Sequence, residues 1–229
     1  MVERLITLCG PPGAGKGTTR RIIETLVPES KRLVVSTSDI IRDELIKQGV
    51  TNFNDRKAKQ EAFVRIATTE GEEWLINRVS RAFRLSDKMV GILDAVCMPM
   101  DIKWLQTLPK YKWVPLYIEA PFRTRRERRR AASQRGETDS KPDEADMNED
   151  DFIEMLMHET AIHIPSFRNI PGTAIIRHDS TIENLGRQII SVLRERLILN
   201  DSDYLIGSRV LLRFYDDFNR KIANRRLQT

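Results

Sequence analysis

The sequence has few cysteines and no long apolar run. Only Cys9 and Cys97 occur among 229 residues, and no CxxC pair is present. This count excludes a disulfide-stapled secreted scaffold and favours a reducing compartment. No stretch of about 18 apolar residues exists, so no membrane-spanning helix is expected. The amino end lacks the pattern of a signal peptide, and we therefore expect a cytoplasmic protein with no membrane partner.

A large excess of one charge is also missing. Lysine and arginine number 38 against 33 acidic residues, a formal net charge of +5. Residues 123–135 hold seven arginines, and residues 137–154 hold nine acidic residues against one lysine. No aromatic residues alternate with these arginines, and an acidic segment follows them. We interpret the pair as a basic helix and a polar flap, and we do not expect a nucleic-acid partner.

Five short apolar runs recur along the chain and alternate with segments of helical length. They cover residues 5–9, 33–36, 90–94, 114–119 and 174–177. Runs of this kind, apolar on both faces, predict an α/β protein with a doubly wound parallel sheet. More than fifty residues separate the second run from the third, and they carry three amphipathic stripes. This length predicts a helical insert.

The strongest signal is the segment GPPGAGKGTT at residues 10–19, which follows the first apolar run and precedes a predicted helix. Its glycines allow backbone N–H groups to surround a phosphate, and the helix amino terminus and Lys16 add positive charge. The pattern predicts a P-loop that binds ATP. The predicted nucleotide-binding residues in this loop are Gly10, Pro11, Gly13, Ala14, Gly15, Lys16, Gly17, Thr18 and Thr19.

This segment, with glycine between lysine and threonine, resembles the loop of the adenylate kinase and nucleoside monophosphate kinase family. Residues 36–42, STSDIIR, are similar to that family's STGDxxR. Leu93 and Asp94 resemble its acidic strand end, and Arg128 falls where it places an arginine over the donor nucleotide. Residues 135–144 are similar to the short lid of uridylate and cytidylate kinases.

The resemblance implies a P-loop kinase with a five-stranded parallel sheet, which transfers the γ-phosphoryl group of ATP to a nucleoside monophosphate with Mg²⁺. It implies a kinase-like domain over residues 1–198, with an acceptor-binding insert at 38–80 and a lid at about 132–150, and leaves 199–229 as a helical extension. The resemblance implies catalytic roles for Lys16, Arg128 and Asp94, and it also places Arg128 at the donor nucleotide. It implies that Thr18, Asp39 and Asp94 hold Mg²⁺, mostly through water. The implied acceptor-binding residues are Thr37, Arg42, Gly71 and Trp74, and the implied lid residues are Arg135 and Lys141.

Two arginines of the family pattern are replaced. Met98 stands where the family has an arginine for the acceptor phosphate, and Met155 stands where it has a second lid arginine. Helical spacing places Arg125, Arg128 and Arg129 on one face, where they are available to compensate. Two alternatives therefore stay open: a P-loop kinase for another small molecule, and a regulatory nucleotide-binding protein with weak catalysis. In the extension, an apolar face over 210–222 fits docking on the body or on a second copy of the chain.

Overall fold

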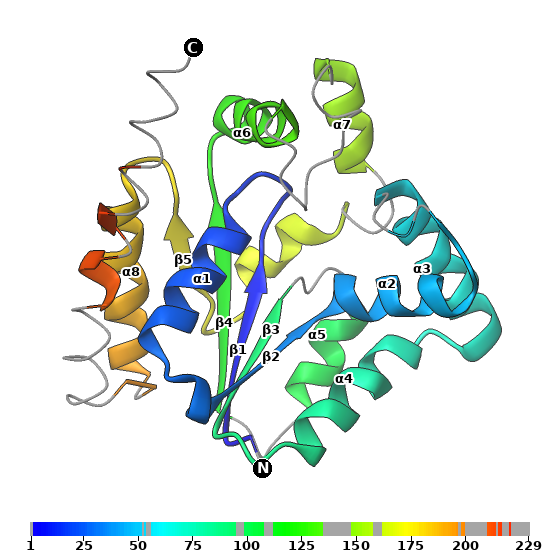
Figure 1. Ribbon diagram of the computed structural model, residues 1–229, viewed down its shortest axis with the longest axis horizontal. Coiled ribbons are helices and arrows are strands. Elements are labelled where there is room, and N and C mark those ends of the chain that lie inside the picture. Colours follow the sequence, from blue (N-terminus) through cyan, green and yellow to red (C-terminus); the bar gives the residue numbers. More distant parts are fainter. Residues whose placement is uncertain are drawn as a thin grey trace.

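Five parallel strands form the centre of the protein, and helices cover both faces of the sheet (Figure 1). The strand order is β2-β3-β1-β4-β5, with bounds β1 (Arg4–Cys9), β2 (Arg32–Ser36), β3 (Val90–Asp94), β4 (Lys112–Glu119) and β5 (Ala174–Arg177). Each predicted apolar run falls within one strand, so the α/β prediction with a five-stranded parallel sheet is confirmed. The computed structural model describes residues 2–51, 53, 56–94, 99–107, 112–134, 148–157, 162–196, 198–199, 210–213, 215–216 and 220.

The central strand β1 supplies both faces of the core. Ile6 and Leu8 belong to one buried cluster, and Leu5 and Cys9 belong to another on the opposite face. Successive side chains of a strand point to opposite faces, and both faces of this sheet are covered. A continuously apolar sequence in β1 is the direct consequence.

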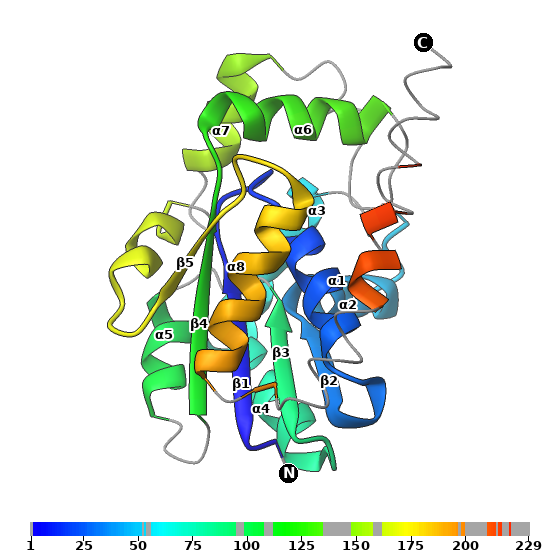
Figure 2. The same ribbon diagram turned by 90° about the vertical axis from the view of Figure 1, so that its left-hand side faces the viewer.

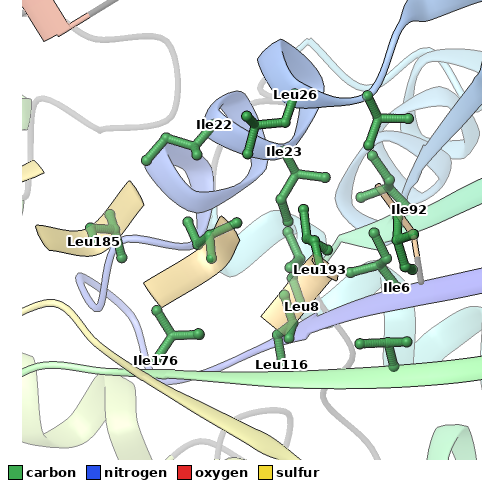
Figure 3. Packing of buried hydrophobic residues seen from close by; sticks show 14 of the residues in the cluster. Ile6, Leu8, Ile22, Ile23, Leu26, Ile92, Leu116, Ile176, Leu185 and Leu193 are labelled. Carbon is green, nitrogen blue, oxygen red and sulfur yellow. The ribbon is translucent and has the colours of Figure 1, made fainter. Parts of the chain in front are cut away.

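Helices α1 (Lys16–Leu26) and α8 (Ile182–Glu195) cover one face. Figure 3 shows isoleucine and leucine side chains of α1 and α8 packed against those of the strands. Their apolar residues recur every three or four positions, which aligns them on one side of each helix. In α1 the buried side chains are Thr19, Ile22, Ile23 and Leu26.

Helices α4 (Trp74–Leu85) and α5 (Pro99–Gln106) cover the other face, together with the 3₁₀ helix η3 (Ile164–Asn169). Phe83 of α4 is fully buried, and it packs in one cluster with Leu105 of α5 and Phe167 of η3. A short 3₁₀ helix, η1 (Glu29–Lys31), precedes β2.

The predicted helical insert lies beside this layer and consists of α2 (Thr37–Lys47), α3 (Arg56–Glu70) and the start of α4. A small cluster of Ile66, Trp74 and Leu75 joins these helices. Ser36 caps α2 by accepting a hydrogen bond from the Asp39 N–H at 3.3 Å. The insert therefore begins directly at the carboxyl end of β2.

Helices α6 (Phe122–Gln134) and α7 (Glu149–Met157) lie beyond the carboxyl ends of the strands, at the top of Figure 2. Arg126 of α6 and Glu149 of α7 form an ion pair at 2.6 Å, which joins the predicted basic helix to the end of the acidic segment. The lid residues Arg135 and Lys141 lie outside the described residues, as does Met98, and nothing is described of the Met155 side chain.

Part of the extension packs against the body beside α8 (Figure 1). Leu211 and Tyr215 are buried in the same cluster as Leu185 and Ile189. A Cβ atom at Gly186 would lie 1.5 Å from the Tyr215 hydroxyl oxygen, so only glycine leaves room for this tyrosine. Within the described residues, no helix has both the length and the apolar character needed to cross a membrane.

Candidate nucleotide-binding site

The predicted P-loop connects β1 to α1 at the carboxyl edge of the sheet. Gly13 has φ +75° and Gly15 has φ +106°, a region that side chains other than glycine rarely adopt. A Cβ at Gly13 would lie 2.5 Å from the Arg125 carbonyl oxygen, and one at Gly15 would lie 2.1 Å from His178 Nδ1. The loop is therefore enclosed by α6 on one side and by the residue after β5 on the other.

The amino terminus of α1 is prepared for an anion. Gly15 caps the helix without a side-chain hydrogen bond, and the first turn carries no acidic residue. Its first N–H groups and the helix dipole therefore favour a negatively charged ligand. Lys16 Nζ donates to the carbonyl oxygens of Gly10 at 2.6 Å and Pro11 at 3.4 Å. Its ammonium group thus lies over the loop that a phosphate would occupy.

Two arginines of α6 border the loop. Arg128 Nη2 donates to the His178 carbonyl at 2.9 Å, while Nη1 is buried and has no hydrogen-bond partner among the described residues. Arg125 Nη1 lies 3.5 Å from the Pro12 carbonyl, and its guanidinium stacks on the rings of Phe122 and Phe152. Burial lowers the pKa of both guanidinium groups, yet arginine remains charged at neutral pH. The unpaired Nη1 of Arg128 is available to an acceptor oxygen from a ligand.

His178 lies directly beneath the loop. The residue is 9% exposed, its Nδ1 lies 3.3 Å from the Ala14 carbonyl, and its N–H donates to the Glu119 carbonyl at 2.8 Å. Burial and the nearby Arg128 charge lower its pKa to about 4, so the ring is neutral at pH 7. The sequence reasoning missed this residue. Its position directly after the predicted strand at 174–177 was the available signal, because parallel strands end at the same edge.

Asp94 closes β3 next to the loop, as predicted. Its register partners are Leu8 of β1 and Ser36 of β2. Its carboxylate pairs with Arg20 of α1, with 2.9 Å between Oδ2 and Nη1, and its carbonyl accepts from the Thr37 hydroxyl at 3.3 Å. Arg20 was also missed by sequence reasoning, although it follows Lys16 by one helical turn.

The other oxygens predicted near Mg²⁺ are less closely associated. Thr18 is partly buried in the first turn of α1, and Asp39 pairs with Arg42 at 2.8 Å. Thr19 is fully buried on the face of α1 that packs on the sheet, and its N–H donates to the Gly15 carbonyl within the helix. The described residues contain no cluster of three metal-ligating side chains. A metal here would rely on few protein oxygens, as Mg²⁺ bound to phosphates usually does.

On the insert side, a cavity of about 820 Å³ lies between α3, α4 and α5. Its lining includes Phe63, Thr68, Glu72, Glu73, Asp101 and Lys103.

Trp74, predicted at the acceptor, is 4% exposed and packs against Phe63 with 6.0 Å between ring centroids. It lies in the core of the insert. Gly71, exposed with φ +90°, separates α3 from α4.

Comparison with known proteins supports the α/β fold with a parallel sheet. Residues 9–146 match the model of a family described as AAA domain. No curated protein matches the chain in sequence. Among solved structures, TT1252 from Thermus thermophilus is 16% identical with a TM-score of 0.51, over 85% of this chain and 98% of that one.

Two further solved structures are similar. Shikimate kinase from Bacteroides thetaiotaomicron is 14% identical with a TM-score of 0.47, over 86% of this chain and 99% of that one. A gluconokinase from Sinorhizobium meliloti 1021 is 10% identical with a TM-score of 0.46, over 84% and 93%.

Proposed function

This chain belongs to the AAA domain family, and we propose that it is a P-loop kinase that transfers the γ-phosphoryl group of ATP to a nucleoside monophosphate. The observation that carries the proposal is the loop before α1, whose glycines are closely enclosed and whose lysine lies over it. Such a loop with an uncapped helix amino terminus binds the phosphates of a nucleotide.

The arginines of α6 support a triphosphate as the ligand. Arg128 reaches the loop with Nη1 buried and unpaired among the described residues, and leaving such a donor unpaired is costly unless a ligand supplies the acceptor. Arg125 is held by aromatic stacking and by hydrogen bonds to backbone carbonyls. Two fixed guanidinium groups near a phosphate loop provide charge that a developing transition state requires.

In the proposed reaction an acceptor phosphate oxygen bonds to the γ-phosphorus of ATP. The bond from that phosphorus to the β–γ bridging oxygen breaks, and its electron pair stays on the departing ADP. The hydroxyl of Thr18 and the carboxylate of Asp94 are hard oxygen donors of the kind that Mg²⁺ prefers. These residues therefore fit Mg²⁺. When bound, Mg²⁺ would neutralise charge on the phosphates.

A second candidate acceptor is favoured by the charge of the cavity. Glu72, Glu73 and Asp101 line it, and Lys103 is its one lysine among the lining residues. Carboxylates in the lining suit an acceptor that presents hydrogen-bond donors, such as a polyol or an amino sugar. A small-molecule kinase of this kind would keep the same donor site, but its acceptor hydroxyl would also have to release its proton, to a base or to water, as its oxygen bonds to the γ-phosphorus.

An acceptor panel separates these functions. ATP with Mg²⁺ is incubated with each ribo- and deoxyribonucleoside monophosphate and with a set of polyols and amino sugars, and ADP and product are quantified. We expect transfer to at least one nucleoside monophosphate. Lys16→Ala should lower kcat about 100-fold or more, whereas Lys112→Ala, exposed at the amino end of β4, should leave it unchanged.

The outcomes exclude one another. Transfer only to polyols or amino sugars would replace the nucleoside monophosphate with the second acceptor class. Tight ATP binding that Lys16→Ala abolishes, without transfer to any acceptor, would refute the kinase proposal and favour a regulatory nucleotide-binding protein.

A further inference from the structure

The side chain of Arg20 connects the helix after the P-loop to the end of β3. Nη1 lies 2.9 Å from Asp94 Oδ2, with the two side chains 29% and 12% exposed. Nε lies 3.3 Å from Glu24 Oε1, an ion-pair contact whose geometry does not make a hydrogen bond. Two carboxylates on fixed elements thus hold the guanidinium in one place.

That place is the point where the donor loop meets the insert. Asp94 lies in register between Leu8, which precedes the loop, and Ser36, which caps the first helix of the insert. The Thr37 hydroxyl also donates to the Asp94 carbonyl. Arg20 therefore carries a positive charge to the boundary between the donor loop and the acceptor side.

The guanidinium has donors to spare. Nη1 is used by Asp94, and no described residue accepts a hydrogen bond from Nη2. The planar group binds a carboxylate with one nitrogen while presenting another to a phosphoryl oxygen. The part-buried position, with the side chain 29% exposed, keeps it accessible while weakening the screening of its charge by solvent.

The other cations of the site lie at other positions, although Arg128 Nη1 is also unpaired among the described residues. Lys16 donates to carbonyls of the loop itself, and Arg128 donates to the His178 carbonyl on the β5 side. Arg42 lies on the insert but pairs with two carboxylates of its own helix, Asp39 and Asp43. Arg20 differs from these cations because its partner Asp94 lies between the strand that leads into the loop and the strand that leads into the insert.

We propose that Arg20 is a catalytic arginine, and that its Nη2 contacts the phosphoryl group in transfer while Nη1 stays on Asp94. This rests on the proposed function. As the acceptor oxygen bonds to the γ-phosphorus and the bridging oxygen leaves with its electron pair, negative charge spreads over the three equatorial oxygens of the phosphoryl group. A guanidinium already fixed beside them stabilises that charge without reorganisation.

The test compares Arg20→Gln, Arg20→Lys and Arg20→Ala with the matched control Arg21→Gln. Arg21 is the next residue of α1 and its side chain is exposed. Turnover is measured with ATP, Mg²⁺ and the nucleoside monophosphate panel. ATP affinity is measured by calorimetry in the same buffer, and Tm by thermal denaturation. Arg20→Ala is also assayed with added guanidinium chloride at low millimolar concentration.

We expect Arg20→Gln to lower kcat about 1000-fold, as for arginines that act on a transferred phosphoryl group. ATP affinity should change less than about threefold, because Arg20 acts on the moving group and leaves the loop intact. Added guanidinium should restore part of the kcat of Arg20→Ala, and Arg20→Lys should retain more activity than Arg20→Gln.

Wild-type turnover with undiminished turnover in Arg20→Gln would overturn the proposal for Arg20 alone. The proposal would also be overturned if Arg20→Gln lowered ATP affinity and Tm together with kcat and added guanidinium restored no activity to Arg20→Ala. Arg20 and Asp94 would then form a structural ion pair. If neither the wild type nor Arg21→Gln transfers phosphate to any acceptor, the proposed function is wrong and the role of Arg20 is refuted with it.

Discussion

Gly15→Ala, at the glycine that directly precedes α1, is expected to disrupt the phosphate loop. The added Cβ would lie 2.1 Å from His178 Nδ1 and 2.9 Å from Cε1, and the residue must keep φ +106°. A side chain at such a φ costs about 1–3 kcal/mol, and overpacking against a buried ring costs about 1–3 kcal/mol more. The ring cannot easily retreat, because it is 9% exposed and its backbone N–H is bonded to Glu119.

This cost of at least about 2 kcal/mol must appear in stability, in ATP affinity, or in both. If this strain destabilises the whole folded state, Tm falls by about 4 °C or more. If the loop instead changes its conformation to relieve the strain, ATP binding becomes weaker by about 30-fold or more. The assay is thermal denaturation together with calorimetric titration of ATP.

Two further variants separate the causes. Gly17→Ala is the matched control for stability, since nothing lies within 4 Å of its Cβ position and its φ is not in the positive range. It should keep or slightly raise Tm, because alanine is favoured over glycine in a helix by about 1 kcal/mol. Adding His178→Ala to Gly15→Ala should recover the packing part only. Unchanged Tm and unchanged ATP affinity in Gly15→Ala would refute the packing described for this loop.

Further predictions concern two buried titratable side chains. The folded pKa of His178, about 4, lies below its ordinary value of 6.5, so the unfolded chain binds more protons between these values. The contribution of His178 to the free energy of unfolding is therefore complete above pH 6.5. It is lost as pH falls toward 4, by up to about 3 kcal/mol. Urea denaturation at both ends of this range should show a smaller pH dependence for His178→Asn, and equal dependence would contradict a buried neutral ring. Burial also raises the pKa of Tyr215 to about 12. Gly186→Ala should displace this tyrosine, and ultraviolet titration should then show its pKa returning toward 10, whereas a pKa still near 12 would contradict the close contact of Tyr215 with Gly186.

Local patterns were enough to predict the strands and the loop. All five apolar runs became strands, because a doubly covered sheet requires apolar side chains on both faces of each strand. The helix predicted to follow the first apolar run and the loop was confirmed as α1, Lys16–Leu26, since Ile22, Ile23 and Leu26 repeat at helical spacing. The three amphipathic stripes between the second and third strands likewise became three helices.

The site was predictable only where its chemistry lies within one segment. The P-loop carries its signal in ten consecutive residues, and the place of Asp94 at the end of β3 follows from a recognisable strand. Trp74 shows the opposite case, since the family resemblance implied a contact with the acceptor. The structure places its side chain in the core of the insert.

The sequence by itself determined the fold class and the phosphate loop, because both depend on hydrophobic periodicity and on glycine positions that act over a few residues. Only the tertiary structure decided which charged groups meet the loop. Arg20 contacts Asp94 across 74 positions of sequence, and His178 contacts Ala14 across 164. These pairs meet because parallel strands end at one edge of the sheet, and the strand order that joins them is set by the packing of the whole core.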